Sequence, residues 1–162
     1  MDLYEKLKCW LNGCKKLAII GLGNELKGDD AVGVYILKKF IKEKEYLIKN
    51  NILFINAQTV PDFFLGIIKE FSPTHIIFID CILANKNPGE IILVDENSIK
   101  SYSYSTHTFP LEVIIKYIKK DSNAKVKIIG VEPKIIDFSP MSGEVREIGD
   151  YIYKVLSKLI GD

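Results

Sequence analysis

Cysteine, histidine and net charge are all scarce in this chain of 162 residues. Three cysteines, Cys9, Cys14 and Cys81, are too few and odd in number for a disulfide framework, and Cys9 and Cys14 lack zinc-finger spacing. Two histidines leave little material for a serine or cysteine catalytic triad. A net charge of +1 gives no electrostatic basis for nucleic-acid binding. The cysteines are therefore expected to be reduced packing residues.

Long apolar runs are also missing. No stretch approaches the roughly 20 apolar residues that a membrane span needs. The first ten residues, MDLYEKLKCW, contain acids and no long apolar core, which is not typical of a secretory signal. We therefore expect a cytoplasmic protein without membrane insertion. A hydrophobic fraction of 48% and a charged fraction of 27% are those of an ordinary globular domain.

Apolar runs of strand length alternate with helical patterns along the whole chain. This alternation predicts an α/β fold: a single three-layer domain over residues 1–162, with a mixed, mostly parallel, twisted sheet of about five strands between helices. The fourth strand is expected to run antiparallel, because the link before it, 81–89, is not helical. Residues 1–14 are expected to form an N-terminal helical extension. The expected strands are 17–20, 51–57, 75–80, 90–95 and 125–131, and the other expected helices are 30–45, 59–71, 109–120 and 142–160.

A glycine-containing loop follows the first predicted strand. Gly21 and Gly23 allow a tight turn, and Asp29 and Asp30 follow where a helix is expected to begin. A dinucleotide fingerprint would need a third glycine where Leu26 stands. Two acids at a helix start would also repel a phosphate. The loop therefore does not indicate a nucleotide site.

Three potential metal ligands follow predicted strand ends or lie in adjoining loops: Asp30, Asp80 and His107. If the strands are parallel neighbours, these side chains converge at one edge of the sheet, where ligands bind in open α/β folds. Two carboxylates and an imidazole suit nickel, zinc or iron, and would leave open positions for water or substrate. Each residue alone has an ordinary explanation as a helix cap, a turn residue or a surface histidine. Together they favour a site.

Nucleophilic catalysis is not favoured. No G-x-S-x-G motif is present, and Asp80 would raise the pKa of the adjacent Cys81 thiol. The second histidine, His75, begins a strand away from the predicted site and is expected to be structural. A hydrolytic function would therefore depend on carboxylates, a metal, or both.

Four segments, taken in order, resemble the hydrogenase maturation proteases. GLGNELKGDDAVG resembles the family signature G-x-G-N-x-L-x-x-D-D/E-x-x-G. FIDCILANKNPGEI resembles the family strand with its Asp and the Pro-Gly that follows, and STHTFPL resembles the histidine segment. IIGVEPKIIDFSPMSGEV resembles the G-x-x-P segment and the start of the last helix, with Met141 in place of the usual leucine.

The resemblance implies an endopeptidase that removes the C-terminal extension of a nickel-iron hydrogenase large-subunit precursor after nickel insertion. Asp30, Asp80 and His107 would contact nickel, which the substrate supplies, so the free enzyme is expected to hold no metal. Asp30 and Asp80 would be catalytic, although which group activates water stays open. Asp29 would orient Asp30 or cap the helix, and Asn24 would lock the loop through side-chain hydrogen bonds.

Three other functions are compatible with these features. The chain could be a non-catalytic, nickel-dependent checkpoint or chaperone for the same precursor, which only a cleavage assay would separate from a protease. It could be a peptidase of related architecture, such as a spore-protein protease, although the His107 segment favours the hydrogenase family. It could be a structural α/β domain, which would show no metal affinity. A monomer is expected, because the enzyme must dock on a large precursor.

Overall fold

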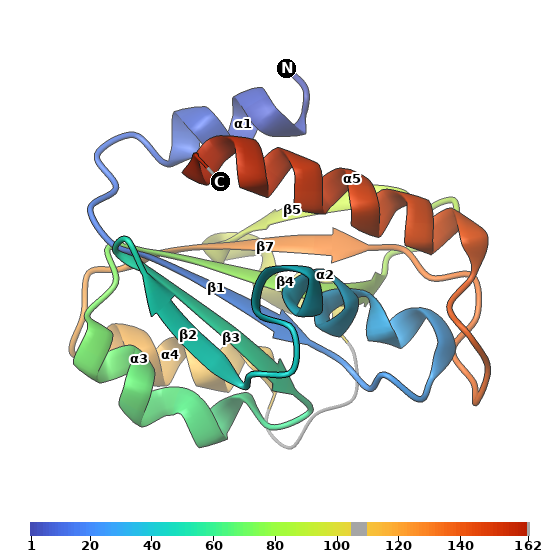
Figure 1. Cartoon of the computed structure of the whole chain (residues 1–162), viewed down its shortest axis with the longest axis horizontal. Coiled ribbons are helices and arrows are strands. Elements are labelled where there is room, and N and C mark those ends of the chain that lie inside the picture. The colour runs from blue at the N-terminus through green and yellow to red at the C-terminus, as the bar shows by residue number, and fades with distance from the viewer. Residues whose placement is uncertain (105–109, 162) are drawn as a thin grey trace.

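A computed structural model describes residues 1–104 and 110–161 of the chain. Its sheet has the strand order β2-β3-β1-β4-β7-β5 (Figure 1), and a short strand, β6, pairs with the end of β4. The four inner strands are mutually parallel, whereas β2 and β5 are antiparallel to their neighbours. The strands are β1 (Leu17–Leu22), β2 (Tyr46–Lys49), β3 (Ile52–Gln58), β4 (His75–Leu83), β5 (Ile91–Asp95), β6 (Ser103–Tyr104) and β7 (Lys125–Val131).

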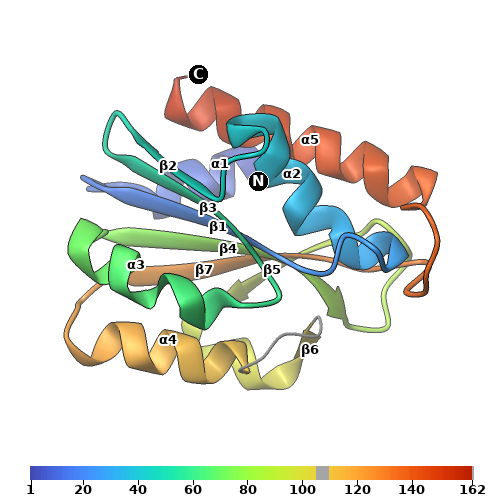
Figure 2. The ribbon, with the colours of Figure 1, turned by 60° about the horizontal axis from the view of Figure 1, so that its bottom comes forward.

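Helices cover both faces of this sheet and complete the predicted three layers (Figure 2). One face carries α1 (Leu3–Trp10), α2 (Val32–Ile41) and α5 (Gly143–Ile160), and the other carries α3 (Leu65–Phe71) and α4 (Leu111–Lys120). Successive side chains of the buried strand β1 alternate between the two cores: Ile19 joins the α2/α5 core, and Ile20 joins the α3/α4 core. Within the described residues, three 3₁₀ segments join these elements: η1 (Gly28–Ala31), η2 (Pro61–Phe64) and η3 (Glu96–Ser101).

The N-terminal extension forms α1, which is shorter than the predicted helix. Asp2 caps it, because its carboxylate accepts the Glu5 N–H at 2.9 Å while the Glu5 side chain accepts the Asp2 N–H. Leu3 and Leu7 are buried in the α2/α5 core, and α1 lies beside α5 (Figure 1). The extension is thus part of the packed layer on that face.

The predicted end of the helix that follows the first strand is wrong. The helix expected over 30–45 consists of η1 and then α2, and α2 ends at Ile41. Lys42 adopts a φ of 57°, a left-handed conformation that does not continue an α-helix. Residues 46–49 then form β2, which pairs antiparallel with β3 and adds a strand to the roughly five that were expected. The predicted antiparallel orientation of residues 90–95 is confirmed, because β5 runs antiparallel to β7.

Candidate active site

The parallel strands β1, β3, β4 and β7 all end at one edge of the sheet, here termed the carboxyl edge. Asp30 lies in η1, directly beyond β1, and is 2% exposed. Asp80 lies inside β4, which continues to Leu83 and therefore extends past the predicted strand end. It still reaches the carboxyl edge, because the pairing of β1 with β4 stops at Ile79. Asp80 is 0% exposed, so both carboxylates are buried at the same edge.

Gly23 allows the chain to fold back so that Asp30 lies against the end of β1. Its φ is +133°, and a Cβ there would lie 1.9 Å from the backbone oxygen of Asp30. The Asn24 N–H donates to Asp30 Oδ2 at 2.9 Å, and Asn24 Oδ1 accepts the Leu26 N–H at 2.9 Å. The predicted role of Asn24 in locking the loop is therefore confirmed. Only glycine fits at position 23, because the Asp30 backbone occupies the space that a Cβ would need.

A second glycine brings the first turn of α2 onto the sheet. A Cβ on Gly33 would lie 2.4 Å from the Leu22 oxygen and 2.5 Å from the Ile79 oxygen. The α2 backbone therefore rests directly on the ends of β1 and β4. This contact holds the segment that carries Asp30 next to the strand that carries Asp80.

The pKa of the Cys81 thiol is affected by the carboxylates at this edge. Burial raises its pKa most, and the charges of Asp30, Asp80, Asp29 and Glu132 raise it further. Cys81 is 2% exposed and belongs to the α2/α5 core. A thiol with a raised pKa is a poor nucleophile, so Cys81 is a packing residue, as predicted.

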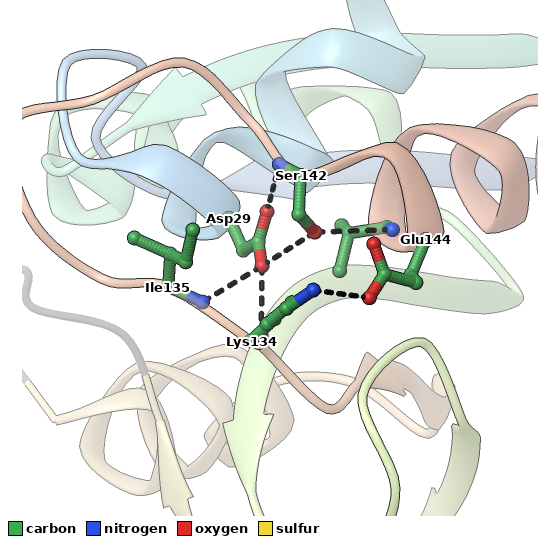
Figure 3. Close-up of polar contacts among 6 residues, drawn as sticks. Asp29, Lys134, Ile135, Ser142 and Glu144 are labelled. Atoms are coloured by element: carbon green, nitrogen blue, oxygen red, sulfur yellow. Dashed lines mark hydrogen bonds and ion pairs between the residues drawn. The ribbon is translucent and has the colours of Figure 1, made fainter.

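Asp29 connects two loops that are distant in sequence (Figure 3). Its Oδ2 accepts the N–H of Lys134 at 2.7 Å, the N–H of Ile135 at 3.0 Å and the Oγ–H of Ser142 at 2.9 Å. Its Oδ1 accepts the Ser142 N–H at 2.7 Å. Of the two roles expected for Asp29, capping a helix is wrong, because neither η1 nor α2 has a side-chain cap. The carboxylate instead fixes the β7–α5 loop and Ser142, whose hydroxyl accepts the Val145 N–H at the start of α5.

Glu132 is a buried acid of this edge that sequence reasoning missed. It directly follows β7, and its Oε1 accepts the N–H groups of Ala84 at 2.8 Å and Lys86 at 3.0 Å. Its backbone also bonds to Gly89 and Glu90. Glu132 therefore holds the loop after β4 in place. The only available signal was an acid directly after a buried strand, in the G-V-E-P run of residues 130–133.

The third predicted ligand, His107, lies outside the residues that the structure describes. Within 1–104 and 110–161, no group of three or more His, Cys, Asp or Glu side chains is arranged to hold a metal. Buried carboxylate oxygens such as those of Asp30 and Asp80 can act as ligands of a divalent cation, but on their own they do not select nickel. The other histidine, His75, begins β4 at the opposite edge, where it is 3% exposed and its Nδ1 lies 3.0 Å from Thr74 Oγ1, consistent with the predicted structural role.

The fold and these residues define a three-layer α/β protein with buried acids at the carboxyl edge of its parallel strands. A family model described as hydrogenase maturation protease matches residues 34–159. The chain is 52% identical over 162 residues to a protein of Methanocaldococcus jannaschii that is named a hydrogenase maturation protease, covering 98% of this chain and 94% of that relative. The chain therefore belongs to the hydrogenase maturation protease family.

More distant relatives agree with this assignment. The hydrogenase 3 maturation protease of Escherichia coli K12 is 28% identical over 140 residues, which cover 85% of this chain and 86% of that protein. The crystal structure of the NiFe hydrogenase maturation protease HycI from Thermococcus kodakarensis superposes with a TM-score of 0.84 at 26% identity, covering 97% of this chain and 99% of that chain.

Among the helices that the structure describes, none is both long and apolar enough to span a membrane.

Proposed function

We propose that this protein is an endopeptidase that removes the C-terminal extension of a nickel-iron hydrogenase large-subunit precursor after nickel insertion. The observation that carries the proposal is the burial of Asp30 and Asp80 at one strand edge within the family fold. Nickel held by the precursor serves as the recognition element, and Asp30, Asp80 and His107 complete its coordination. The enzyme works in the cytoplasm as a monomer and holds no metal between turnovers.

Two carboxylates can serve a peptide hydrolysis without a serine or cysteine nucleophile. A buried carboxylate close to the scissile carbonyl can accept a proton from water as the water attacks, and can then pass this proton to the leaving amine nitrogen as the C–N bond breaks. The peptide must then be positioned so that water and carboxylate meet at hydrogen-bond distance. Nickel shared between enzyme and precursor would supply that positioning, and a nickel-free precursor would lack it. Selectivity for one loaded protein follows from this dependence.

The test compares nickel-loaded and nickel-free precursor from the same cell, each incubated with the purified protein and followed by mass spectrometry. We expect loss of one C-terminal peptide from the nickel-loaded precursor only. The Asp30→Asn variant should cleave at least about a hundredfold more slowly, which is the usual effect of removing a general base. Asp121→Asn, which changes an exposed carboxylate at the end of α4, should cleave normally.

A checkpoint function is the second candidate and makes a different prediction. A checkpoint protein would bind the nickel-loaded precursor and leave its mass unchanged. Asp30→Asn would then weaken binding, whereas under the protease proposal the loss appears in cleavage. Normal cleavage by a folded Asp30→Asn variant would contradict the catalytic assignment.

A further inference from the structure

Exposed apolar side chains gather on the loops that leave the carboxyl edge. Single exposed apolar residues are ordinary on protein surfaces, but a concentration on one face is not. Phe63 and Phe138 are 73% and 80% exposed, and Leu26 is 66% exposed. Six of the twelve large exposed apolar residues in the described part of the chain follow β1, β3 or β7 or end β4. This set, here called the apolar rim, is Leu26, Val60, Phe63, Leu83, Ile136 and Phe138.

Backbone hydrogen bonds fasten the rim loops to one another. The Gly23 N–H donates to the Gln58 oxygen at 2.9 Å, which joins the loop after β1 to the end of β3. The Gly28 N–H donates to the Ser139 oxygen at 3.0 Å, which joins the loop after β1 to the loop after β7. These two loops run side by side at the right of Figure 1. The loops after β1, β3 and β7, which carry most of the rim, are therefore joined to one another.

The rim lies at the same edge of the sheet as the buried acids. Leu26 lies in the loop whose Asn24 N–H bonds to Asp30. Leu83 ends the strand that contains Asp80. Phe138 belongs to the loop that Asp29 holds in place, and its ring lies 5.8 Å from the Lys27 ammonium. A polypeptide that approaches Asp30 and Asp80 from this edge therefore meets loops that expose apolar side chains.

Charged side chains beside the rim balance one another: Lys27 and Asp137 carry opposite charges, and two ion pairs lie nearby. Glu25 binds Lys38 at 2.7 Å, and Lys134 binds Glu144 at 2.8 Å. Such exposed pairs leave little net charge to attract a charged partner. The complementary surface of a partner is thus apolar rather than acidic or basic.

We propose that the apolar rim is the surface on which the precursor docks, with apolar side chains beside the scissile bond packing against Leu26 and Phe138. This inference rests on the proposed function. A second copy of the chain is a poorer occupant, because it would cover the acids that the substrate must reach. Packing against the rim supplies binding energy in the ground state and the transition state alike, so its loss should raise KM more than it lowers kcat.

The test uses the double variant Leu26→Ser/Phe138→Ser with nickel-loaded precursor. Both side chains are exposed, so the variant should fold and melt like the parent protein. We expect KM to rise at least about tenfold, because each substitution removes a large apolar contact, while kcat changes less than about twofold. The matched control is Val113→Ser/Tyr117→Ser, which removes two exposed apolar side chains from α4, 49% and 59% exposed. The control should keep the parent KM.

Each outcome separates the two proposals. Cleavage by the parent protein with an unchanged KM in the double variant would overturn docking on the rim and leave the protease function intact. An equal rise of KM in rim and control variants would overturn it as well, since the effect would not be local. Failure of the parent protein to bind or cleave any nickel-loaded precursor of its cell would overturn both proposals. If the parent protein and the control variant form dimers and the rim variant is a monomer, the rim is a self-association surface instead.

Discussion

Asp29 joins the η1 segment to the β7–α5 loop. Its two oxygens accept four hydrogen bonds, and the side chain is 0% exposed. Asp29→Ala would leave buried donors without acceptors, so we expect the free energy of unfolding to fall by about 3–5 kcal/mol. Urea unfolding followed by circular dichroism measures this. Asp29→Asn keeps one carbonyl acceptor and should lose less stability. A loss below about 1 kcal/mol for Asp29→Ala would contradict the role of Asp29 in joining η1 to the β7–α5 loop.

Gly23 tests how closely the loop backbone must approach Asp30. Gly23→Ala places a methyl group 1.9 Å from the Asp30 backbone oxygen at a φ of +133°, so the Asp30 segment must move. We expect a stability loss of at least about 2 kcal/mol together with loss of cleavage. Gly66→Ala is the matched control: nothing lies within 4 Å of its Cβ, and it should stabilise α3 by about 0.5–1 kcal/mol. Equal melting temperatures for the two variants would refute this account.

At the scale of elements, β7 controls the loop that follows β4. Glu132, at the end of β7, accepts the amides of Ala84 and Lys86. Glu132→Ala should therefore speed hydrogen exchange at these two amides at least about tenfold, since a bond to a charged acceptor contributes about 1.5–3 kcal/mol. Exchange measured residue by residue by NMR tests this. Glu132→Gln keeps a carbonyl acceptor and should protect both amides better than alanine does. Unchanged exchange in Glu132→Ala would show that the loop after β4 is ordered without Glu132.

Apolar runs allowed most elements to be predicted, because the strands that build the centre of the sheet are buried on both faces. Residues 46–49 were missed because edge strand β2 is largely exposed and follows a lysine-rich helix end. Asp30 and Asp80 could be selected because parallel strands end at one edge. The partners of Asp29 could not, since they lie more than a hundred residues further along the chain. Glu132 was missed because its role depends on amides that only the folded sheet brings near.

Over the whole molecule, the two edges of the sheet carry different ionisable groups. The carboxyl edge carries buried acids, whereas the amino edge carries His75, whose ring packs against Trp10 with centroids 4.9 Å apart. Burial, and then the positive charge of Lys125, lowers the pKa of His75 from its usual value of 6.5, although a backbone contact with Trp10 opposes the shift. The folded state therefore favours neutral His75.

A lowered pKa means that the unfolded chain binds the His75 proton more readily than the folded chain. The stability that neutral His75 allows is thus complete above pH 6.5 and is lost as the pH falls through the lower pKa of the folded state. Urea unfolding from pH 7.5 down to 5 should show the free energy of unfolding falling more steeply in the parent protein than in His75→Gln. His107 is present in both chains, so its titration cancels in their difference. Parallel pH profiles would mean that His75 titrates alike in the folded and unfolded states, and that acid sensitivity above pH 5 arises elsewhere.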